Sequence, residues 1–118
     1  IGYLNYGYVV GGKFQQAAVQ NRAGNYVKAS GETSAAGLAQ IVLDDKLRGT
    51  DANPAGVNAF PIVSLTWILA EPGHKTSAVK SALRYMLSEE AQGVSDSLGY
   101  VPLPESLRQK SLAAVEGL

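Results

Sequence analysis

A mixed α/β fold is predicted for this chain of 118 residues. Apolar residues make up 46% of the chain and charged residues 17%, which is typical of globular proteins and excludes disorder for most of its length. Stretches rich in β-branched and aromatic residues alternate with stretches whose apolar residues recur at helical spacing. The resulting order of strand, hairpin, helix, long loop, strand, helix and helix indicates a mixed α/β piece.

The charge balance and the absence of cysteine exclude several function classes. Ten Lys and Arg balance ten Asp and Glu, so no basic excess favours a nucleic-acid partner. Without cysteine the chain has no disulfide, no thiolate metal site and no Cys nucleophile. The longest apolar stretch, residues 63–70, is far too short to span a bilayer.

The start of the chain predicts a strand followed by a hairpin. Residues 1–10 are rich in Tyr and Val and favour a strand. The turn-rich residues 21–25 separate residues 14–20 from residues 26–29, which favours a hairpin. Because a protein rarely begins inside a strand, we expect the chain to be a processed or truncated piece of a larger protein.

A helix and a long loop are expected next. Thr33 or Ser34 would supply the N-cap of the helix, and Gly49 would end it. Residues 49–58 contain Thr, Asp, Asn, Pro and Gly, a composition typical of a surface loop.

The second half predicts one buried strand and two helical regions. Residues 60–69 are the most apolar stretch and favour a buried strand. A helix would start at Thr76 or Ser77, and the helical region would end at Gly99; a last helix would have Pro104 in its first turn. The apolar face of the first of these helices consists of Val79, Ala82, Leu83, Met86 and Leu87.

Three short patterns suggest chemistry but favour structural readings. Residues 7–13 have the Gly and Lys spacing of a phosphate-binding loop, yet Phe14 stands where Ser or Thr would hold magnesium, so a strand ending in a Gly-Gly turn is preferred. Ser77 and Lys80 fit a Ser-x-x-Lys pattern without its companion motifs, which favours a helix cap and a solvent-facing lysine. His74 is the only histidine, and no other residues converge on it, so we expect no metal site.

One candidate anion site lies at the start of the first predicted helix. Ser30, Gly31, Thr33 and Ser34 combine small hydroxyl residues with a glycine, and exposed N–H groups at a helix N-terminus bind anions. Glu32 would place a negative charge beside the anion, and capping explains the same residues. The cap is therefore the preferred reading of this segment.

Three segments carry a resemblance to a known family. They are IGYLNYGY at residues 1–8, FPIVSLTWIL at residues 60–69 and LGYVPLP at residues 98–104. In this order and spacing they resemble the C-terminal third of the periplasmic phosphate-binding proteins that serve high-affinity phosphate ABC transporters. That family has the two-lobed fold of type II periplasmic binding proteins, so the resemblance implies that the chain is part of such a fold.

The resemblance also implies a division of the chain. Residues 1–58 would end the second lobe, residues 59–69 would cross between the lobes, and residues 70–118 would form closing helices of the first lobe. The hinge would then contain Phe60, Pro61 and Ile62. We expect the parts before and after the crossing to make few mutual contacts, and apolar patches left without their partners to promote self-association.

By resemblance, the function would be that of a non-catalytic segment of a phosphate receptor. The full-length protein would bind inorganic phosphate and deliver it to a membrane permease, in the periplasm or attached to the cell surface, without a cofactor or nucleic acid. The family's phosphate-binding motifs do not map onto this sequence, so no ligand residue is expected within it. The alternatives are a free-standing, hydrolase-like α/β enzyme and an interaction module that uses the Tyr-rich start.

Overall fold

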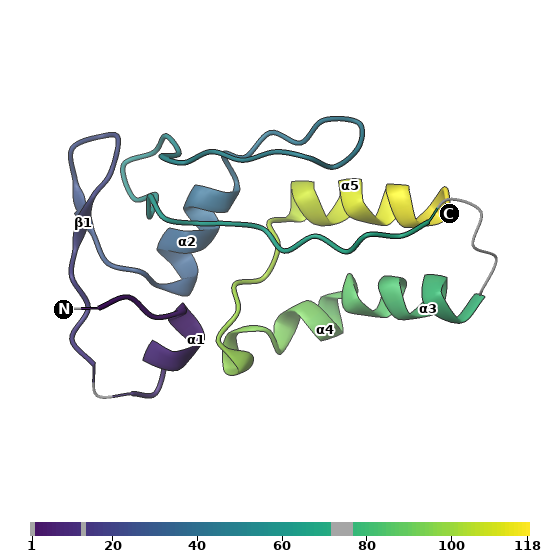
Figure 1. Ribbon diagram of the computed structural model, residues 1–118, viewed down its shortest axis with the longest axis horizontal. Coiled ribbons are helices and arrows are strands. Elements are labelled where there is room, and N and C mark those ends of the chain that lie inside the picture. The colour runs from purple at the N-terminus through teal and green to yellow at the C-terminus, as the bar shows by residue number, and fades with distance from the viewer. Residues whose placement is uncertain (1, 13, 72–76) are drawn as a thin grey trace.

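Helices and one small sheet form the regular structure of residues 2–12, 14–71 and 77–118, the part of the chain that the computed structural model describes (Figure 1). The sheet has two strands, β1 (Val19–Gln20) and β2 (Tyr26–Val27). The helices are α1 (Tyr6–Val9), α2 (Gly31–Leu38), α3 (Ser77–Met86), α4 (Glu89–Gly93), the 3-10 helix η1 (Asp96–Leu98) and α5 (Glu105–Glu116). The predicted mixture of helix and strand is confirmed. His74, Lys13 and the alternative helix start Thr76 lie outside the described residues.

The predicted hairpin is confirmed, although its strands are short. β1 and β2 are antiparallel, with Val19 opposite Val27. Within the turn, the Asn21 amide donates a hydrogen bond to the Asn25 carbonyl at 2.8 Å. The chain reverses direction at the turn residues 21–25, as their composition predicts.

A buried asparagine ties the hairpin to the long loop. Asn21 is only 4% exposed, and its side-chain Nδ2 lies within 3.2 Å of three loop carbonyls, those of Gly56, Val57 and Ala59. Its Oδ1 accepts hydrogen bonds from the backbone N–H groups of residues 23 and 25. One side chain therefore satisfies polar backbone groups of two segments that are distant in sequence.

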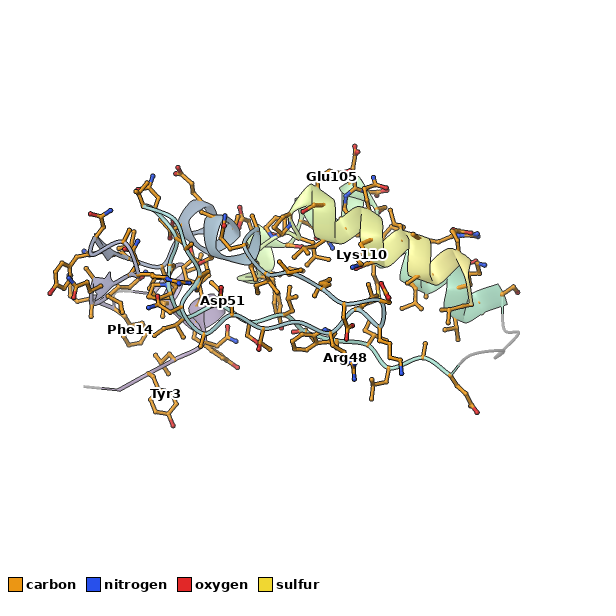
Figure 2. The ribbon with its side chains drawn as sticks, turned by 90° about the horizontal axis from the view of Figure 1, so that it is seen from above. Tyr3, Phe14, Arg48, Asp51, Glu105 and Lys110 are labelled. Carbon is orange, nitrogen blue, oxygen red and sulfur yellow. The ribbon has the colours of Figure 1, made fainter. Side chains whose placement is uncertain are left out.

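The strand expected over residues 1–10 is wrong within the described residues. Asn5 accepts a hydrogen bond from the Gly7 amide through Oδ1 at 3.0 Å and so caps the short helix α1. Residues 2–5 have no regular structure, and Tyr3 points away from the body of the molecule (Figure 2). An Asn cap stabilises a local turn, whereas a strand needs a neighbour, and none is present beside this segment in the described chain.

Helix α2 begins and ends earlier than expected. Its N-cap is Ser30, so the predicted caps Thr33 and Ser34 lie inside the helix. The helix stops at Leu38 instead of continuing toward Gly49. After it, Asp44 accepts backbone hydrogen bonds in a turn, which is an alternative to helix that aspartate side chains often favour.

The segment 60–69 crosses the molecule without helix or strand and is not a buried strand (Figure 1). No strand pairs with it in the part of the chain that the structure describes. Pro61 is buried, whereas Ile68 and Leu69 are 57% and 97% exposed. The prediction of a buried strand is wrong for this segment, because β-propensity alone does not form a strand without a partner to pair with.

The C-terminal helices lie close to their predicted positions, although Pro104 precedes the last helix instead of standing in its first turn. α3 begins at Ser77, η1 is followed by Gly99 in the left-handed conformation, and Pro104 is the residue just before α5. α3 and α5 run side by side in opposite directions (Figure 1). The Arg84 guanidinium forms a two-point ion pair with the Glu116 carboxylate across this contact.

A second arginine joins the start of α5 to the end of α3. The Arg108 side chain is 10% exposed and donates hydrogen bonds to the Glu105 carboxylate at 2.7 and 2.9 Å. It also donates to the carbonyl of Leu87 at 3.1 Å. These polar contacts hold the helices together, whereas no residue of α3 is buried.

The hydrophobic core is small and joins the two halves of the chain. Its buried members are Leu38, Ile41, Leu43 and Leu107, with Leu47, Val63, Leu65 and Val101 packed against them. Lys110 of α5 also donates a hydrogen bond to the carbonyl of Leu43. Residues of both 1–48 and 70–118 therefore contribute to this core, and the division into lobes stays a prediction.

The chain exposes an unusually large surface. A folded monomer of 12.4 kDa exposes about 6100 Å², whereas this chain exposes 8352 Å². Its radius of gyration is 15.7 Å, compared with about 13.5 Å for a compact domain of this length. The exposed large apolar residues include Ile62, Trp67, Ile68, Leu69, Val79 and Met86.

Candidate functional site

The predicted anion site at the start of α2 is a helix cap. The Ser30 hydroxyl accepts a hydrogen bond from the Thr33 amide at 3.1 Å, and the Thr33 hydroxyl accepts one from the Ser30 amide at 3.0 Å. Thr33 Oγ1 also donates to the Lys28 carbonyl at 2.8 Å. This reciprocal capping box engages both hydroxyls and two of the amides that an anion would need.

Two carboxylates also lie at this helix end. A Cβ atom at Gly31 would be 3.1 Å from Asp96 Oδ1, so the Asp96 carboxylate already sits against the first turn. Glu32 lies within that turn, and Ser34 is buried. The helix dipole is thus complemented by negative side chains, which would repel an added anion. The structure supports the preferred reading of residues 30–34 as a cap.

The other two sequence patterns also have structural roles. Residues 6–9 form α1, so the pattern beginning at Gly7 does not form an open phosphate-binding loop. Lys80 donates a hydrogen bond to the Glu116 carbonyl at 2.8 Å and lies 3.7 Å from its carboxylate. Lys80 is half-buried between α3 and α5, which corrects the expectation that it faces solvent.

A surface hollow lies where the first and third resemblance motifs meet. It has a volume of about 350 Å³ and is lined by Asn5, Gly7, Tyr8, Leu98 and Tyr100. The two tyrosines are 75% and 63% exposed, and the Asn5 oxygen already caps α1. No charged side chain lines the hollow, so it has the character of an open aromatic surface.

The altered pKa values of the described residues come from hydrogen bonds and ion pairs at the surface; for example, hydrogen bonds from Gln109 and Arg108 lower the pKa of the Glu105 carboxyl. Arg48 donates hydrogen bonds to Asp44 and lowers the pKa of that carboxyl to about 2. Arg84 lowers the pKa of the Glu116 carboxyl, and Glu116 in turn raises the pKa of the Arg84 guanidinium. The first pair closes the turn at residues 44–48, and the second joins α3 to α5. Neither pair lines the hollow.

The described residues offer neither a metal site nor a membrane-spanning helix. They contain no group of three or more His, Cys, Asp or Glu side chains suited to holding a metal ion. Among the helices of the same residues, none combines the length and apolarity required to cross a membrane.

The sequence analysis did not identify Asn21 as the residue that joins the hairpin to the long loop. Its loop partners lie more than thirty positions further along the chain, so no local pattern shows them.

Comparison with known proteins relates the chain to a class of solute-binding proteins. Its relatives in that class are phosphate-binding proteins PstS. The chain is 29% identical to the one from Methanocaldococcus jannaschii, over 98% of the chain and 34% of the relative. It is 31% identical to those from Xylella fastidiosa, over 91% of the chain and 31% of the relative, and from Pasteurella multocida, over 93% and 33%.

These similarities confirm the resemblance noted from the sequence motifs. The chain spans about a third of the length of the curated relatives it matches. No family model matches the chain.

Proposed function

We propose that these residues are part of a receptor that binds inorganic phosphate and delivers it to the permease of an ABC transporter. The observation that carries the proposal is the similarity to phosphate-binding proteins along more than nine-tenths of the chain. In this proposal the receptor has the two-lobed fold, works in the periplasm or at the cell surface, and performs no catalysis.

The phosphate ligands of the proposed receptor lie outside these 118 residues. The candidates Ser30, Gly31, Thr33 and Ser34 cap α2 or lie within it, and the Asp96 carboxylate lies against the same helix end. A phosphate would need donors there, whereas two carboxylates would oppose its charge. In this proposal, these 118 residues form part of the fold that surrounds the ligand site and supply no ligand themselves.

Within the receptor, residues 1–58 would end the second lobe and residues 70–118 would close the first. Residues 59–69 would cross between them, with the hinge at Phe60, Pro61 and Ile62. The irregular backbone of this segment and the rigid φ of Pro61 suit a crossing connection. Leu38 and Leu107 share one core cluster in the 118-residue chain, so this division requires each of them to have other partners in the whole receptor.

A thermal-shift experiment on the full-length gene product tests the proposed function. Phosphate should raise its Tm in a concentration-dependent manner, because a ligand that binds only the folded state stabilises it. Sulfate and buffer alone are the matched controls and should leave the Tm unchanged. A Tm that does not respond to phosphate would contradict the proposal.

A further inference from the structure

We propose that the hairpin of residues 14–29 is a docking surface for an acidic face of the ABC permease. The inference rests on the proposed function and deepens it, because it names the part of the receptor that meets its membrane partner. In this proposal the permease presents Asp and Glu side chains to the hairpin. Binding to the permease can be measured independently of phosphate binding.

The first part of the chain carries an excess of positive charge. Residues 1–31 contain three basic and no acidic residues. Residues 32–118 contain seven basic and ten acidic residues, so the zero net charge of the chain combines two parts of opposite sign. The three basic residues of the first part, Lys13, Arg22 and Lys28, lie within the hairpin or directly before it in the sequence. A basic surface attracts an acidic partner and speeds its association.

The two basic residues that the structure describes in the hairpin are available to a partner. Arg22 and Lys28 are both exposed. Within the described part of the chain, no ion pair links either side chain to a carboxylate, whereas Arg48 and Arg84 are paired with Asp44 and Glu116. Each hairpin charge can therefore pair with a carboxylate of another protein without breaking an ion pair of its own chain.

One face of the hairpin combines positive charge with aromatic surface. In the pairing of β1 with β2, Gln20 lies opposite Tyr26. Val27 is half-buried, whereas Tyr26 and Lys28 on either side of it are exposed, so these two side chains share the outward face of the hairpin. Tyr26 is 72% exposed. Tyr and Arg are enriched among the residues that contribute most to binding at protein interfaces, which suits a docking surface built around Tyr26 and Arg22.

The hairpin has a fixed shape, which favours a protein partner over a lipid surface. It lies at the end of the molecule opposite to the C-terminus (Figure 1), and Asn21 joins it to the long loop through three carbonyls. Asn25 Nδ2 adds a hydrogen bond to the Val57 carbonyl at 3.0 Å. A preorganised surface loses little entropy when it binds a complementary protein. Binding to anionic lipid is typical of clusters of about four to eight basic residues, more than the three present here.

Binding of the full-length gene product to the phosphate permease of the same organism, held in nanodiscs of neutral lipid, provides the direct test. Arg22→Glu and Lys28→Glu should each weaken this binding by about fivefold or more, mainly through slower association, and added salt should reduce the difference. Lys46→Glu is the matched control, because it makes the same charge change at an exposed position outside the hairpin, and it should weaken binding by less than about twofold. Hairpin variants that bind as tightly as the parent sequence, or a control that is weakened equally, would overturn the proposal.

Lipid vesicles distinguish the membrane surface from the permease as the partner. The full-length protein should bind vesicles of anionic phosphatidylglycerol no more tightly than vesicles of neutral phosphatidylcholine. Binding to the anionic vesicles that is lost in Arg22→Glu, while binding to the permease is unchanged, would identify the membrane as the partner and overturn the proposal. Arg22→Gln and Lys28→Gln remove the charge without reversing it, so they decide the test if a charge-reversed protein does not fold.

Failure of the docking proposal can be separated from failure of the proposed function. A full-length protein that binds phosphate and the permease, with equal permease binding by the hairpin variants, would support the function and overturn the docking surface. A protein that binds the permease through the hairpin but does not respond to phosphate would support the docking surface and reject the phosphate receptor. A protein that does not bind the permease would overturn the docking surface, and its response to phosphate would still test the receptor.

Discussion

Gly7 and Gly99 lie in direct backbone contact although they come from opposite ends of the chain. A Cβ atom at Gly99 would be 2.2 Å from Gly7 Cα, and Gly99 has a φ of 78°, which side chains other than glycine rarely adopt. These glycines belong to the first and third motifs of the resemblance. Their contact gives a physical reason for a glycine at this point of each motif, because a side chain at either position would meet the other backbone.

Substitution of Gly99 should strongly destabilise the chain. Gly99→Ala combines a left-handed backbone with a clash against backbone atoms, so we expect the free energy of unfolding to fall by about 2 kcal/mol or more. Chemical denaturation measures this change. Gly93→Ala in α4 is the control, because a Cβ there meets nothing within 4 Å. If both variants have the same midpoint as the parent sequence, the contact does not stabilise the fold.

Asn21 should be the most important polar side chain of the N-terminal half. Asn21→Ala removes the donor to three carbonyls and the acceptor for two amides, which should lower the free energy of unfolding by about 1–3 kcal/mol. Asn53→Ala, at an exposed position of the neighbouring loop, should change it by less than about 0.5 kcal/mol. Urea denaturation compares the two, and an equal effect would show that the hairpin does not depend on Asn21.

Acid should loosen the turn around Asp44 over a defined pH range. The folded-state pKa of this carboxyl is about 2, below its ordinary value of 3.8, so the ionised form is favoured by folding. The stabilisation is complete above pH 4 and is lost as the pH falls toward 2. Carbon NMR titration of the carboxyl should give the low pKa. Arg48→Gln should raise it toward 3.8, whereas Arg22→Gln should not; an unchanged pKa in Arg48→Gln would contradict the assignment.

Coupling between Leu38 and Leu107 tests the proposed division into lobes. In the 118-residue chain both are buried in one cluster, so the effects of Leu38→Ala and Leu107→Ala on the free energy of unfolding should not be additive. In the full-length protein they should add to within about 0.5 kcal/mol if they belong to different lobes. A double-mutant cycle in each protein measures this. Strong coupling in the full-length protein would contradict the division.

Features set by local chemistry could be predicted from the sequence. The turn residues 21–25 predict the hairpin. Gly99 follows the end of η1 and Pro104 precedes the start of α5, close to the expected positions. Outside the hairpin, the presence of a strand could not be predicted in this way. Residues 60–69 have the right residues for a strand, but pairing depends on a neighbour that a single segment does not encode.

The sequence alone could not decide whether residues 30–34 form an anion site or a helix cap, because the answer depends on hydrogen-bond partners. Ser30 and Thr33 carry the residue types of an anion site and of a cap alike, and only the structure shows their reciprocal hydrogen bonds. The partners of Asn21 and Gly7 are distant in sequence, so no local pattern identifies them. The three family motifs were the signal that could be read from the sequence, and the comparisons agree with it.

Titration calorimetry with phosphate, on the full-length gene product and on the 118-residue chain side by side, tests the central claim most directly. The account predicts micromolar or tighter binding by the full-length protein, and weak or no binding by the 118-residue chain, whose α2 N-terminus is already capped. Sulfate should not compete with phosphate for the full-length protein. Micromolar or tighter binding by the 118-residue chain would contradict the assignment of the ligand site, and no binding by the full-length protein would contradict the proposed receptor.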